Sequence, residues 1–389
     1  MTDPLIYLIA GEPSGDLLAA RLMAGLKQLT GGRIAFAGIG GEAMREEGLV
    51  SLFPQADLAV MGLAEVLPRI PRILHRLGQT MADIRARQPD AVVTVDSWGF
   101  TGRVAKRLKA EGSTSPRIHY VAPMVWAWKE KRVHQLAGRV DLLLCLLPNE
   151  PAYFLEAGLP AVHVGHSVLE SGADKGDGEG FRARHGIPPD APLLCVLPGS
   201  RRSETSRLLP VFADTVGRLA ADRPTLRVVL PTVETVRDEV AAAIRPWPVP
   251  VTLVTGAAER YDAFAASRAA LAASGTVALE LALAGLPMVI GYRVARLTAA
   301  LARRLLKIRY VSLPNLLMDR PVVPEYLQEN CRPDRLAAAL GRLMDDEAAR
   351  SEQLAGLAAA LDRLGRGQGS PSLRAAREVL GQIAGKERV

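Results

Sequence analysis

Cysteine is scarce in this chain, which has only three cysteines among 389 residues. They are Cys145, Cys195 and Cys331, and they lie far apart, with no CxxC pair and no Cys/His spacing. Such a set predicts a reduced compartment and no zinc site. No DxD pair follows an expected strand, so nothing marks a diphosphate bound through a metal ion. We therefore expect no metal and no cofactor.

We also expect no signal peptide and no transmembrane segment. The beginning, MTDPLIYLIAGEPSGD, has an acid at Asp3, no basic leader and only six apolar residues in a row. It predicts a first strand and not a signal peptide. The apolar run 271–292 contains a single charge, Glu280, but it is interrupted by Ser274, Gly275, Gly285 and Pro287. It favours strand, turn, helix, turn and strand over one spanning helix.

The charge balance is mildly basic. The chain has 48 basic and 41 acidic residues, a net charge of +7, and 40 of the basic residues are Arg. This composition suits phosphate-bearing partners such as nucleic acid, anionic lipid or nucleotide, because a guanidinium group binds phosphate at two positions. Aromatic residues make up only 5%, and no segment resembles a nucleic-acid module with aromatic platforms. We expect no nucleic-acid partner.

Length and composition predict a folded chain of two domains, since apolar residues make up 49% and charged residues 23%. Short apolar runs alternate with helical patterns, which is typical of a parallel sheet covered by helices. In the first half these runs are residues 5–10, 34–37, 91–95, 118–121, 142–146 and 161–164. In the second half they are residues 193–197, 227–230, 251–254, 269–272 and 288–290.

The fold class predicted is α/β, with two doubly wound Rossmann-like domains facing across a cleft. We expect an N-terminal domain over residues 1–168, a Gly-rich and acidic linker over 169–180 and a second domain over 181–345. Residues 346–389 read as C-terminal helices, which either cross back to the first domain or are exchanged within a homodimer.

Two strand-to-helix turns of the second half combine glycine, hydroxyl and charged side chains. In LPGSRRSE, the residues Gly199, Ser200, Arg201 and Arg202 would place amides and guanidinium groups around a diphosphate. The alternative is a solvated basic helix cap.

The second of these turns is ASGTVALE, with Ser274, Gly275, Thr276 and Glu280. Its amides could hold phosphate while Glu280, on the same helix face as Thr276, accepts ribose hydroxyls. A glutamate within an apolar run needs a partner in any case, because an unpaired buried charge is costly.

Two turns of the first half are candidates for a ligand site. In AGEPSGD, two glycines allow close approach of the backbone to a ligand, and Ser14 is placed to cap the next helix. Asp96 follows a buried-type strand and could take a proton from an attacking hydroxyl. A helix cap is an equally good interpretation of either turn. The segment HYVAPMVWAWKEKR adds tryptophans and a basic cluster, whose alternative role is core packing.

An amphipathic helix is expected within residues 66–87. Its spacing alone favours core packing, but a basic rim beside an apolar stripe is also typical of a helix that lies on anionic lipid. The residues assigned to this membrane face are Leu67, Arg69, Ile70, Arg72, Ile73, Leu74 and Arg76.

Taken in order, these blocks resemble the lipid-A-disaccharide synthases, which are glycosyltransferases of the GT-B type. The likeness covers nearly the whole chain and rests on AGEPSGD, GIGGEAM, LAVMGLAEVL, HYVAPMVWAWKEKR, LLPNE, VGHS, LPGSRRSE, ASGTVALE, MVIGYR and YVSLPNLL. It implies inverting, metal-independent transfer of 2,3-diacylglucosamine from its UDP adduct to 2,3-diacylglucosamine 1-phosphate. The products are the β-1,6 disaccharide and UDP, formed at the cytoplasmic face of the inner membrane.

The resemblance also assigns residues. The second half would hold UDP, with Tyr292, Arg293, Asn315 and Gln328 added near the nucleotide or its sugar, and Asp96 would be the base for the acceptor hydroxyl. The acceptor side would comprise Glu12, Ser14, Gly15, Asp16, Met61, His119, Trp126 and Lys129.

After Asp96 the family usually has a Pro-Asp-Phe turn, whereas this chain has Trp98, Gly99 and Phe100, so a second acid is absent. Two alternatives remain open. One is another GT-B enzyme that uses UDP-N-acetylglucosamine, and the other is a non-catalytic peripheral membrane protein that binds a nucleotide.

Overall fold

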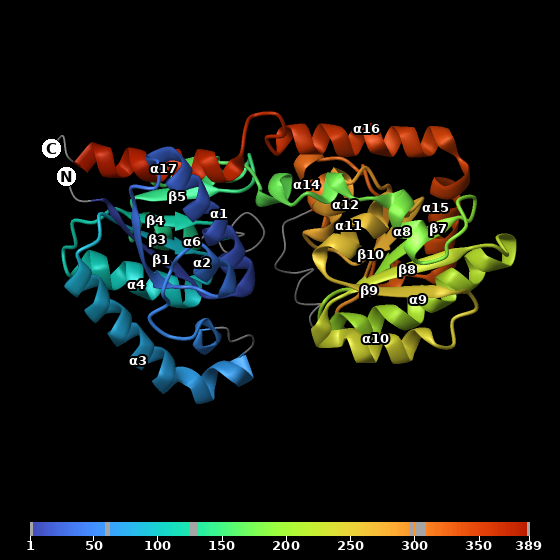
Figure 1. Cartoon of the computed structure of the whole chain (residues 1–389), viewed down its shortest axis with the longest axis horizontal. Helices are drawn as coiled ribbons and strands as arrows, with labels where there is room; N and C mark the ends of the chain where they lie inside the picture. Colours follow the sequence, from blue (N-terminus) through green and yellow to red (C-terminus); the bar gives the residue numbers. More distant parts are fainter. Residues whose placement is uncertain (1–2, 59–62, 124–130, 296–298, 300–308, 387–389) are drawn as a thin grey trace. The chain divides into compact units, whose positions relative to one another are not determined.

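The computed structural model describes residues 3–58, 63–123, 131–295, 299 and 309–386. The chain divides into two compact units, one comprising Met1–Ser167 with Gly367–Val389 and the other Val168–Arg366. Each unit is built on a sheet of six parallel strands with helices on both faces (Figure 1). The α/β class and the two Rossmann-like units are confirmed.

The first unit is wound about strand β1. Its strands are β1 (Leu5–Ala10), β2 (Ala35–Ile39), β3 (Ala91–Val95), β4 (Arg117–Tyr120), β5 (Leu142–Cys145) and β6 (Ala161–His163), in the order β2-β1-β3-β4-β5-β6. Its helices are α1 (Pro13–Thr30), α2 (Glu42–Glu46), α3 (Leu63–Arg87), α4 (Trp98–Ala110), α6 (Lys131–Ala137), α7 (Glu150–Leu155) and α17 (Pro371–Lys386). A short 3-10 helix, η1 (Gln55–Asp57), precedes α3.

Alternation along β1 separates the core of this unit into two layers. Ile6 and Leu8 point to the face that helices α1 and α17 cover. Tyr7 and Ile9 point to the opposite face, where α3 and α4 pack. All four side chains are fully buried. A strand that is apolar at every position therefore fits a sheet with helices on both faces.

The second unit has the same architecture around β7. Its strands are β7 (Leu193–Leu197), β8 (Arg227–Thr232), β9 (Val251–Thr255), β10 (Ala269–Ala272), β11 (Met288–Tyr292) and β12 (Glu325–Leu327), in the order β12-β11-β10-β7-β8-β9. Its helices are α8 (Gly178–Arg184), α9 (Arg202–Asp222), α10 (Arg237–Ile244), α11 (Ala257–Ala266), α12 (Val277–Leu283), α14 (Leu313–Met318), α15 (Pro333–Asp345) and α16 (Glu347–Arg363). Short 3-10 helices are η2 (Ser167–Glu170), η3 (Ala173–Lys175), η4 (Glu234–Val236) and η5 (Gln328–Asn330).

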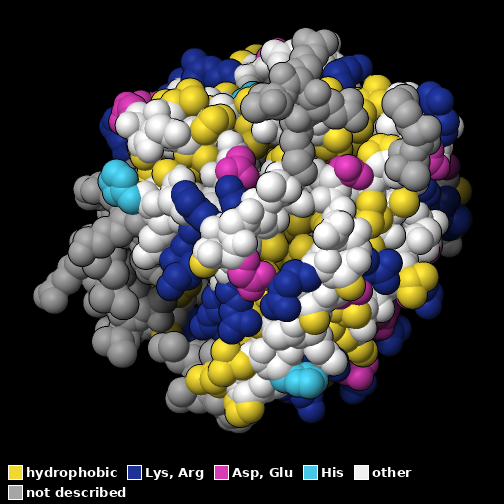
Figure 2. Space-filling view, turned by 90° about the vertical axis from the view of Figure 1, so that its left-hand side faces the viewer, with side chains coloured by type: hydrophobic (Ala, Val, Ile, Leu, Met, Phe, Trp, Pro, Cys, Tyr) yellow, Lys and Arg dark blue, Asp and Glu magenta, His cyan; other side chains and the backbone are white. Residues whose placement is uncertain are grey.

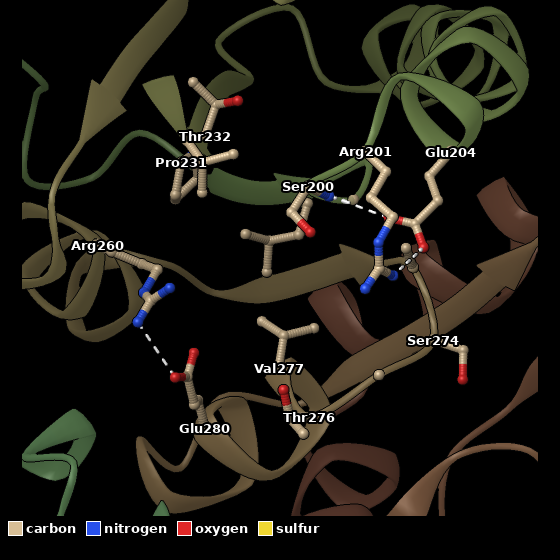
Figure 3. A pocket seen from close by; sticks show the side chains of 15 residues that line it. Ser200, Arg201, Glu204, Pro231, Thr232, Arg260, Ser274, Thr276, Val277 and Glu280 are labelled. Atoms are coloured by element: carbon tan, nitrogen blue, oxygen red, sulfur yellow. Dashed lines mark hydrogen bonds and ion pairs between the residues drawn. The ribbon is translucent and has the colours of Figure 1, made fainter. Parts of the chain in front are cut away.

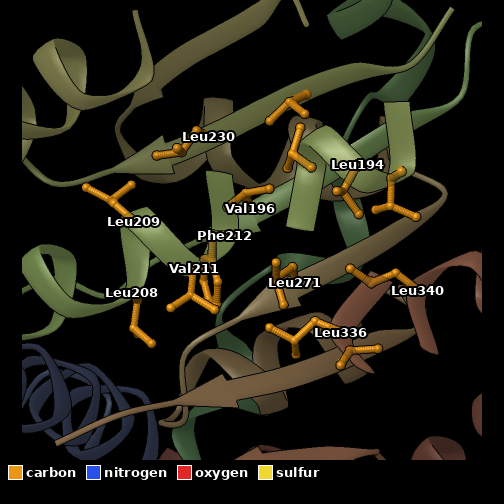
Figure 4. Close-up of a cluster of buried hydrophobic side chains, with 14 of the residues drawn as sticks. Leu194, Val196, Leu208, Leu209, Val211, Phe212, Leu230, Leu271, Leu336 and Leu340 are labelled. Atoms are coloured by element: carbon orange, nitrogen blue, oxygen red, sulfur yellow. The ribbon is translucent and has the colours of Figure 1, made fainter. Parts of the chain in front are cut away.

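The core of the second unit fixes the helix that follows β7. Leu194 and Val196 of β7 pack against Phe212 of α9 and against Leu336 and Leu340 of α15 (Figure 4). All five side chains are fully buried. Since α9 is held along its length by this cluster, its first turn has a defined position at the end of β7.

The apolar run 271–292 is distributed over β10, α12 and β11, as expected. In the described part of the chain no helix is long and apolar enough to span a membrane.

The boundaries of the units differ from the expected ones at two places. Helix α17 packs on α1 of the first unit, which agrees with the alternative that the C-terminal helices cross back, but α16 packs on α12 and α14 of the second unit, so only part of residues 346–389 crosses. The expected linker 169–180 is instead packed structure. A Cβ atom added to Gly176 would stand 2.1 Å from the carbonyl oxygen of Tyr261 in α11. Glycine permits this close contact because it has no side chain. In the sequence, the glycines of this segment are typical of a flexible linker.

Candidate functional site

A pocket of about 410 Å³ opens in the second unit at the carboxyl ends of β7, β8 and β10. The chain runs from β7 to β8 and β9 on one side of the sheet, and then to β10, β11 and β12 on the other. Such a reversal leaves a crevice in which open α/β sheets bind ligands. The candidate residues that line the pocket are Gly199, Ser200, Arg201, Ser274, Gly275, Thr276 and Glu280. The structure thus brings together both turns selected from the sequence.

One end of the pocket is the turn between β7 and α9 (Figure 3). Gly199 has a φ of +105°, which favours glycine, and Arg201 is the N-cap residue of α9. The carboxylate of Glu204 accepts a hydrogen bond from the Ser200 amide at 3.1 Å and another from the Tyr292 hydroxyl at 3.2 Å. It also lies 3.5 Å from the Arg201 guanidinium. Sequence reasoning missed Glu204, although its position three residues after a helix start is typical of a capping residue.

Tyr292 reaches the pocket only through this carboxylate, because it is not itself part of the lining. Burial, together with the neighbouring negative charge of Glu204, raises the pKa of Tyr292. The phenol is therefore protonated at neutral pH and acts as the donor in this pair.

The opposite end of the pocket holds a second pair of charges (Figure 3). The Glu280 carboxylate lies 3.1 Å from the guanidinium of Arg260 on α11, which also lies 5.0 Å from the ring centre of Tyr261. This is the partner that a glutamate in an apolar run required. Sequence reasoning missed Arg260, because its segment AERYDAF carries no pattern that places it at the end of β10.

Two other arginines assigned to the donor lie outside this pocket. Arg202 points away from it, with 83% of its side chain exposed, and lies 3.7 Å from Glu239 of α10. The Arg293 guanidinium donates to the carbonyl of Cys331. Neither guanidinium lines the pocket in this structure, and their contact with the donor stays a prediction. Successive residues at a helix start point in different directions, and Arg293 is used to hold the chain after β12.

Asn315 and Gln328 hold the backbone. The buried amide of Asn315 donates to the carbonyl of Val323 and accepts from its N–H, both at 2.8 Å. The Gln328 amide, in the orientation that satisfies it, makes the same two bonds to Val294 at 3.3 and 3.0 Å. Neither residue lines the pocket. Both amides therefore have a structural role in bringing distant loops together, and their contact with the nucleotide stays a prediction.

Asp96 lies at the corresponding position of the first unit. The first sheet reverses between β1 and β3, and Asp96 follows β3 directly. Its side chain is exposed, and its φ is +49°. Its backbone is held by a bond from its N–H to the Tyr120 carbonyl at 3.0 Å and by one from the Thr101 hydroxyl to its own carbonyl at 2.7 Å. A residue held in this region of φ and ψ beside a strand end is typical of a functional site.

The turn after β1 has mostly structural roles. Glu12 is the N-cap residue of α1 without a side-chain cap bond, and Ser14 is exposed within the helix, so the expected cap at Ser14 is wrong. Gly15 is buried where α1 passes the end of β3. Asp16 is buried and accepts from the amides of residues 41, 43 and 44 at 2.7, 2.9 and 3.2 Å. It caps α2, which corrects its assignment to the acceptor side.

His119 is an interior residue. It is 1% exposed, its Nδ1 lies 2.8 Å from the Thr94 hydroxyl, and its ring packs edge-on against Trp98. Burial lowers the pKa of His119 to about 3, so the ring is neutral. This corrects its assignment to the acceptor side. Met61, Trp126 and Lys129, the other residues assigned there, lie outside the described residues.

Of the residues on helix α3 that were expected to face the membrane, some are exposed and others are buried. Ile73 is buried in the core of the first unit, which corrects its assignment to the surface, whereas Ile70 and Leu74 are 40% and 50% exposed. Both arginines pair with Asp57: Arg76 donates to it through Nε at 2.8 Å, and Arg72, which stays mostly exposed, lies 3.5 Å from it. The side chains of Leu67 and Arg69 lie outside the described residues. Figure 2 shows a face on which Lys and Arg side chains gather beside exposed hydrophobic side chains.

Within the described ranges, no three His, Cys, Asp or Glu side chains group as a metal site. The three cysteines are buried and unpaired with one another.

Comparisons with known proteins agree with the resemblance found in the sequence. The family model described as Lipid-A-disaccharide synthetase matches residues 6–369. A curated lipid-A-disaccharide synthase from Paramagnetospirillum magneticum is 59% identical over 98% of this chain and 99% of its own. Another, from Rhodospirillum centenum, is 56% identical over 98% and 96%.

Solved structures are similar at lower identity. A Staphylococcus aureus MnaA–UDP co-structure has a TM-score of 0.63 at 13% identity, with 98% of this chain and 96% of that chain covered. Acinetobacter baumannii MurG has a TM-score of 0.58 at 16% identity, with 97% and 99% covered. These structures show the shared GT-B fold.

Proposed function

The chain belongs to the lipid-A-disaccharide synthetase family, and from this premise we propose which substrates it joins and which side chains act on them. As a member it is a glycosyltransferase of lipid A biosynthesis. We propose that the donor is UDP-2,3-diacylglucosamine and the acceptor is 2,3-diacylglucosamine 1-phosphate. The products are the β-1,6-linked disaccharide 1-phosphate and UDP.

The donor is assigned to the pocket of the second unit. The diphosphate would lie at the turn after β7, where the Ser200 amide, the first turn of α9 and the Arg201 guanidinium supply donors. The ribose would lie at the other end, near Glu280 and Arg260. This pocket, with the amides of a helix start and Arg201 at one end and the Glu280–Arg260 pair at the other, is the observation that carries the proposal.

The base is assigned to Asp96 of the first unit. Its carboxylate would take the proton of the acceptor hydroxyl as that oxygen bonds to the anomeric carbon. The bond between this carbon and the diphosphate oxygen breaks, and the electron pair leaves with UDP. Attack from the side opposite the leaving group inverts the anomeric centre. Arg201 and the turn amides would stabilise the charge that develops on UDP.

Binding to a membrane surface is proposed for helix α3. Ile70, Leu74 and Arg72 are exposed on it, and both substrates carry acyl chains that remain in a bilayer. The enzyme would then work as a peripheral protein at the cytoplasmic face of the inner membrane. A homodimer stays a prediction, which sedimentation of the purified protein would test.

Turnover by the purified protein with both acylated sugars tests the whole proposal. We expect stoichiometric release of UDP and formation of the disaccharide, each requiring both substrates. Activity on unacylated UDP-N-acetylglucosamine, without any lipid requirement, would assign the chain to another reaction of the same fold. Tight UDP binding with no turnover would instead indicate a non-catalytic nucleotide-binding protein.

A further inference from the structure

Glu204 occupies the donor end of the pocket with a negative charge. Its carboxylate accepts from the Ser200 amide at 3.1 Å and from the Tyr292 hydroxyl at 3.2 Å, and it lies 3.5 Å from the Arg201 guanidinium. A Cβ atom added to Gly199 would stand 2.4 Å from one of its carboxylate oxygens. The side chain therefore lies directly against the turn that was selected as a phosphate site.

The groups that hold Glu204 are the groups that a diphosphate would need. An amide at a helix start, a guanidinium group and a phenol are all donors to anions. Glu204 is mostly buried, with 13% of its side chain exposed, so its charge is poorly screened by solvent. A phosphate group placed at this turn would both compete with the carboxylate for donors and be repelled by it.

We propose that Glu204 is a residue that discriminates between the donor and the product UDP by charge, and this proposal rests on the function proposed above. Free UDP ends in a phosphate monoester, whose second pKa is about 6, so it carries about one more negative charge than the diphosphate of a UDP-sugar. Repulsion by Glu204 then weakens the hold on UDP more than the hold on the donor. The expected result is faster release of product.

A purely structural role makes a different prediction. Glu204 is the third residue after the N-cap Arg201, where a carboxylate commonly caps a helix. If capping were its whole role, its replacement would loosen the turn and weaken every ligand of the pocket to a similar degree. The two roles are therefore separated by how the effect depends on the charge of the ligand.

The decisive variant is Glu204→Gln, which keeps an oxygen acceptor for Ser200 and removes the charge. Measured by calorimetry, the variant should bind uridine as the wild type does, UMP severalfold more tightly and UDP about tenfold more tightly. UDP should also become a stronger product inhibitor, by the same factor of about ten. Glu204→Ala should give the same order and covers the case in which glutamine impairs folding.

Glu239→Gln is the matched control. Glu239 also lies beside α9, where it accepts from the Thr205 hydroxyl at 2.9 Å, but it does not line the pocket. The variant Glu239→Gln removes the same charge and should leave the affinities for uridine, UMP and UDP unchanged.

Each outcome decides between charge discrimination and helix capping as the role of Glu204. Equal or uniformly weaker binding of all three ligands by Glu204→Gln would overturn the proposal and leave a helix cap. An equal gain in Glu239→Gln would assign the effect to net charge, which also overturns it. Failure of the wild-type protein to bind UDP would instead contradict the proposed function itself.

Discussion

The side chain of Ser97 lies directly over the backbone of Gly11. A Cβ atom added to Gly11 would stand 2.6 Å from the Ser97 hydroxyl oxygen and 2.8 Å from its Cβ. Asp96 and Ser97 both have positive φ values, +49° and +45°, and the Ser97 hydroxyl is buried with no hydrogen-bond partner in the described part of the chain. The absence of a side chain at position 11 is thus a condition for the turn that presents Asp96.

Gly11→Ala should displace this turn. Overpacking of this kind costs about 1 to 3 kcal/mol, and we expect a similar loss in the free energy of unfolding. We also expect kcat to fall at least tenfold, because Asp96 moves, while the affinity for UDP is unchanged. Gly78→Ala is the control: Gly78 lies within helix α3 with open space around it, so alanine there should not destabilise the protein. Full activity of Gly11→Ala would show that the turn adapts.

Asp96→Asn should lower turnover by about 10² to 10⁴ without affecting UDP binding. The amide keeps the size of the side chain but cannot accept a proton, and the loss of a general base typically costs 10² to 10⁴ in rate. Turnover is measured with both substrates and UDP binding by calorimetry. A rate near that of the wild type would remove the assignment of Asp96 as the base.

The strands were predictable because their pattern depends only on local burial. Runs of apolar residues such as 5–10 and 193–197 coincide with β1 and β7, since a strand covered on both faces is apolar throughout. Strand β12 was missed because its three residues, Glu325–Leu327, include a charge and are only partly buried. Turns between strand and helix were also found, because glycine and hydroxyl residues have backbone reasons to be there.

Individual roles within the site were less predictable. Asp16, His119 and Asn315 lie in motifs of the family, but a motif does not distinguish a residue that contacts a ligand from one that holds the motif together. Arg260 could not be found because its role depends on packing of α11 beside the end of β10. Only the fold brings residues 260 and 280 within 3.1 Å of each other.

Arg201→Ala should lose much of the stabilisation of the leaving group. Removing one donor to a developing negative charge costs about 2.7 to 4 kcal/mol, so we expect kcat to fall by about 10² to 10³. Arg202→Ala is the natural comparison, because Arg202 is the next residue but points out of the pocket. It should have a much smaller effect. Similar losses in both variants would contradict the placement of the diphosphate beside Arg201.

Acid should destabilise the first unit through His119. Burial lowers the pKa of His119 to about 3, below the value of about 6.5 that it has when unfolded. The unfolded state therefore binds a proton that the folded state does not. Its contribution to stability is complete above about pH 6.5 and decreases as the pH falls towards 3, by up to about 1.4 kcal/mol per pH unit.

His119→Gln tests this dependence. The variant should show a shallower decrease in the free energy of unfolding between pH 7 and pH 5, measured by urea denaturation, whatever its stability at pH 7. His75→Gln, at an exposed position of α3, is the matched substitution and should keep the wild-type slope. An unchanged slope in His119→Gln would mean that the ring accepts a proton within the folded unit.

Replacing Ile70 and Leu74 together by serine should release the protein from lipid. Both side chains are exposed on α3. Each would contribute up to about 2 kcal/mol to the free energy of binding if it entered a bilayer. Arg72→Glu should weaken binding further, by about 1 kcal/mol or more, and only at low salt, since it acts on the surface charge. Sedimentation with vesicles that contain anionic lipid measures both effects. Leu155→Ser, at an exposed position of α7 that is 55% exposed, is the control and should bind as the wild type does. Undiminished binding by the double serine variant would show that α3 is not the surface that contacts lipid.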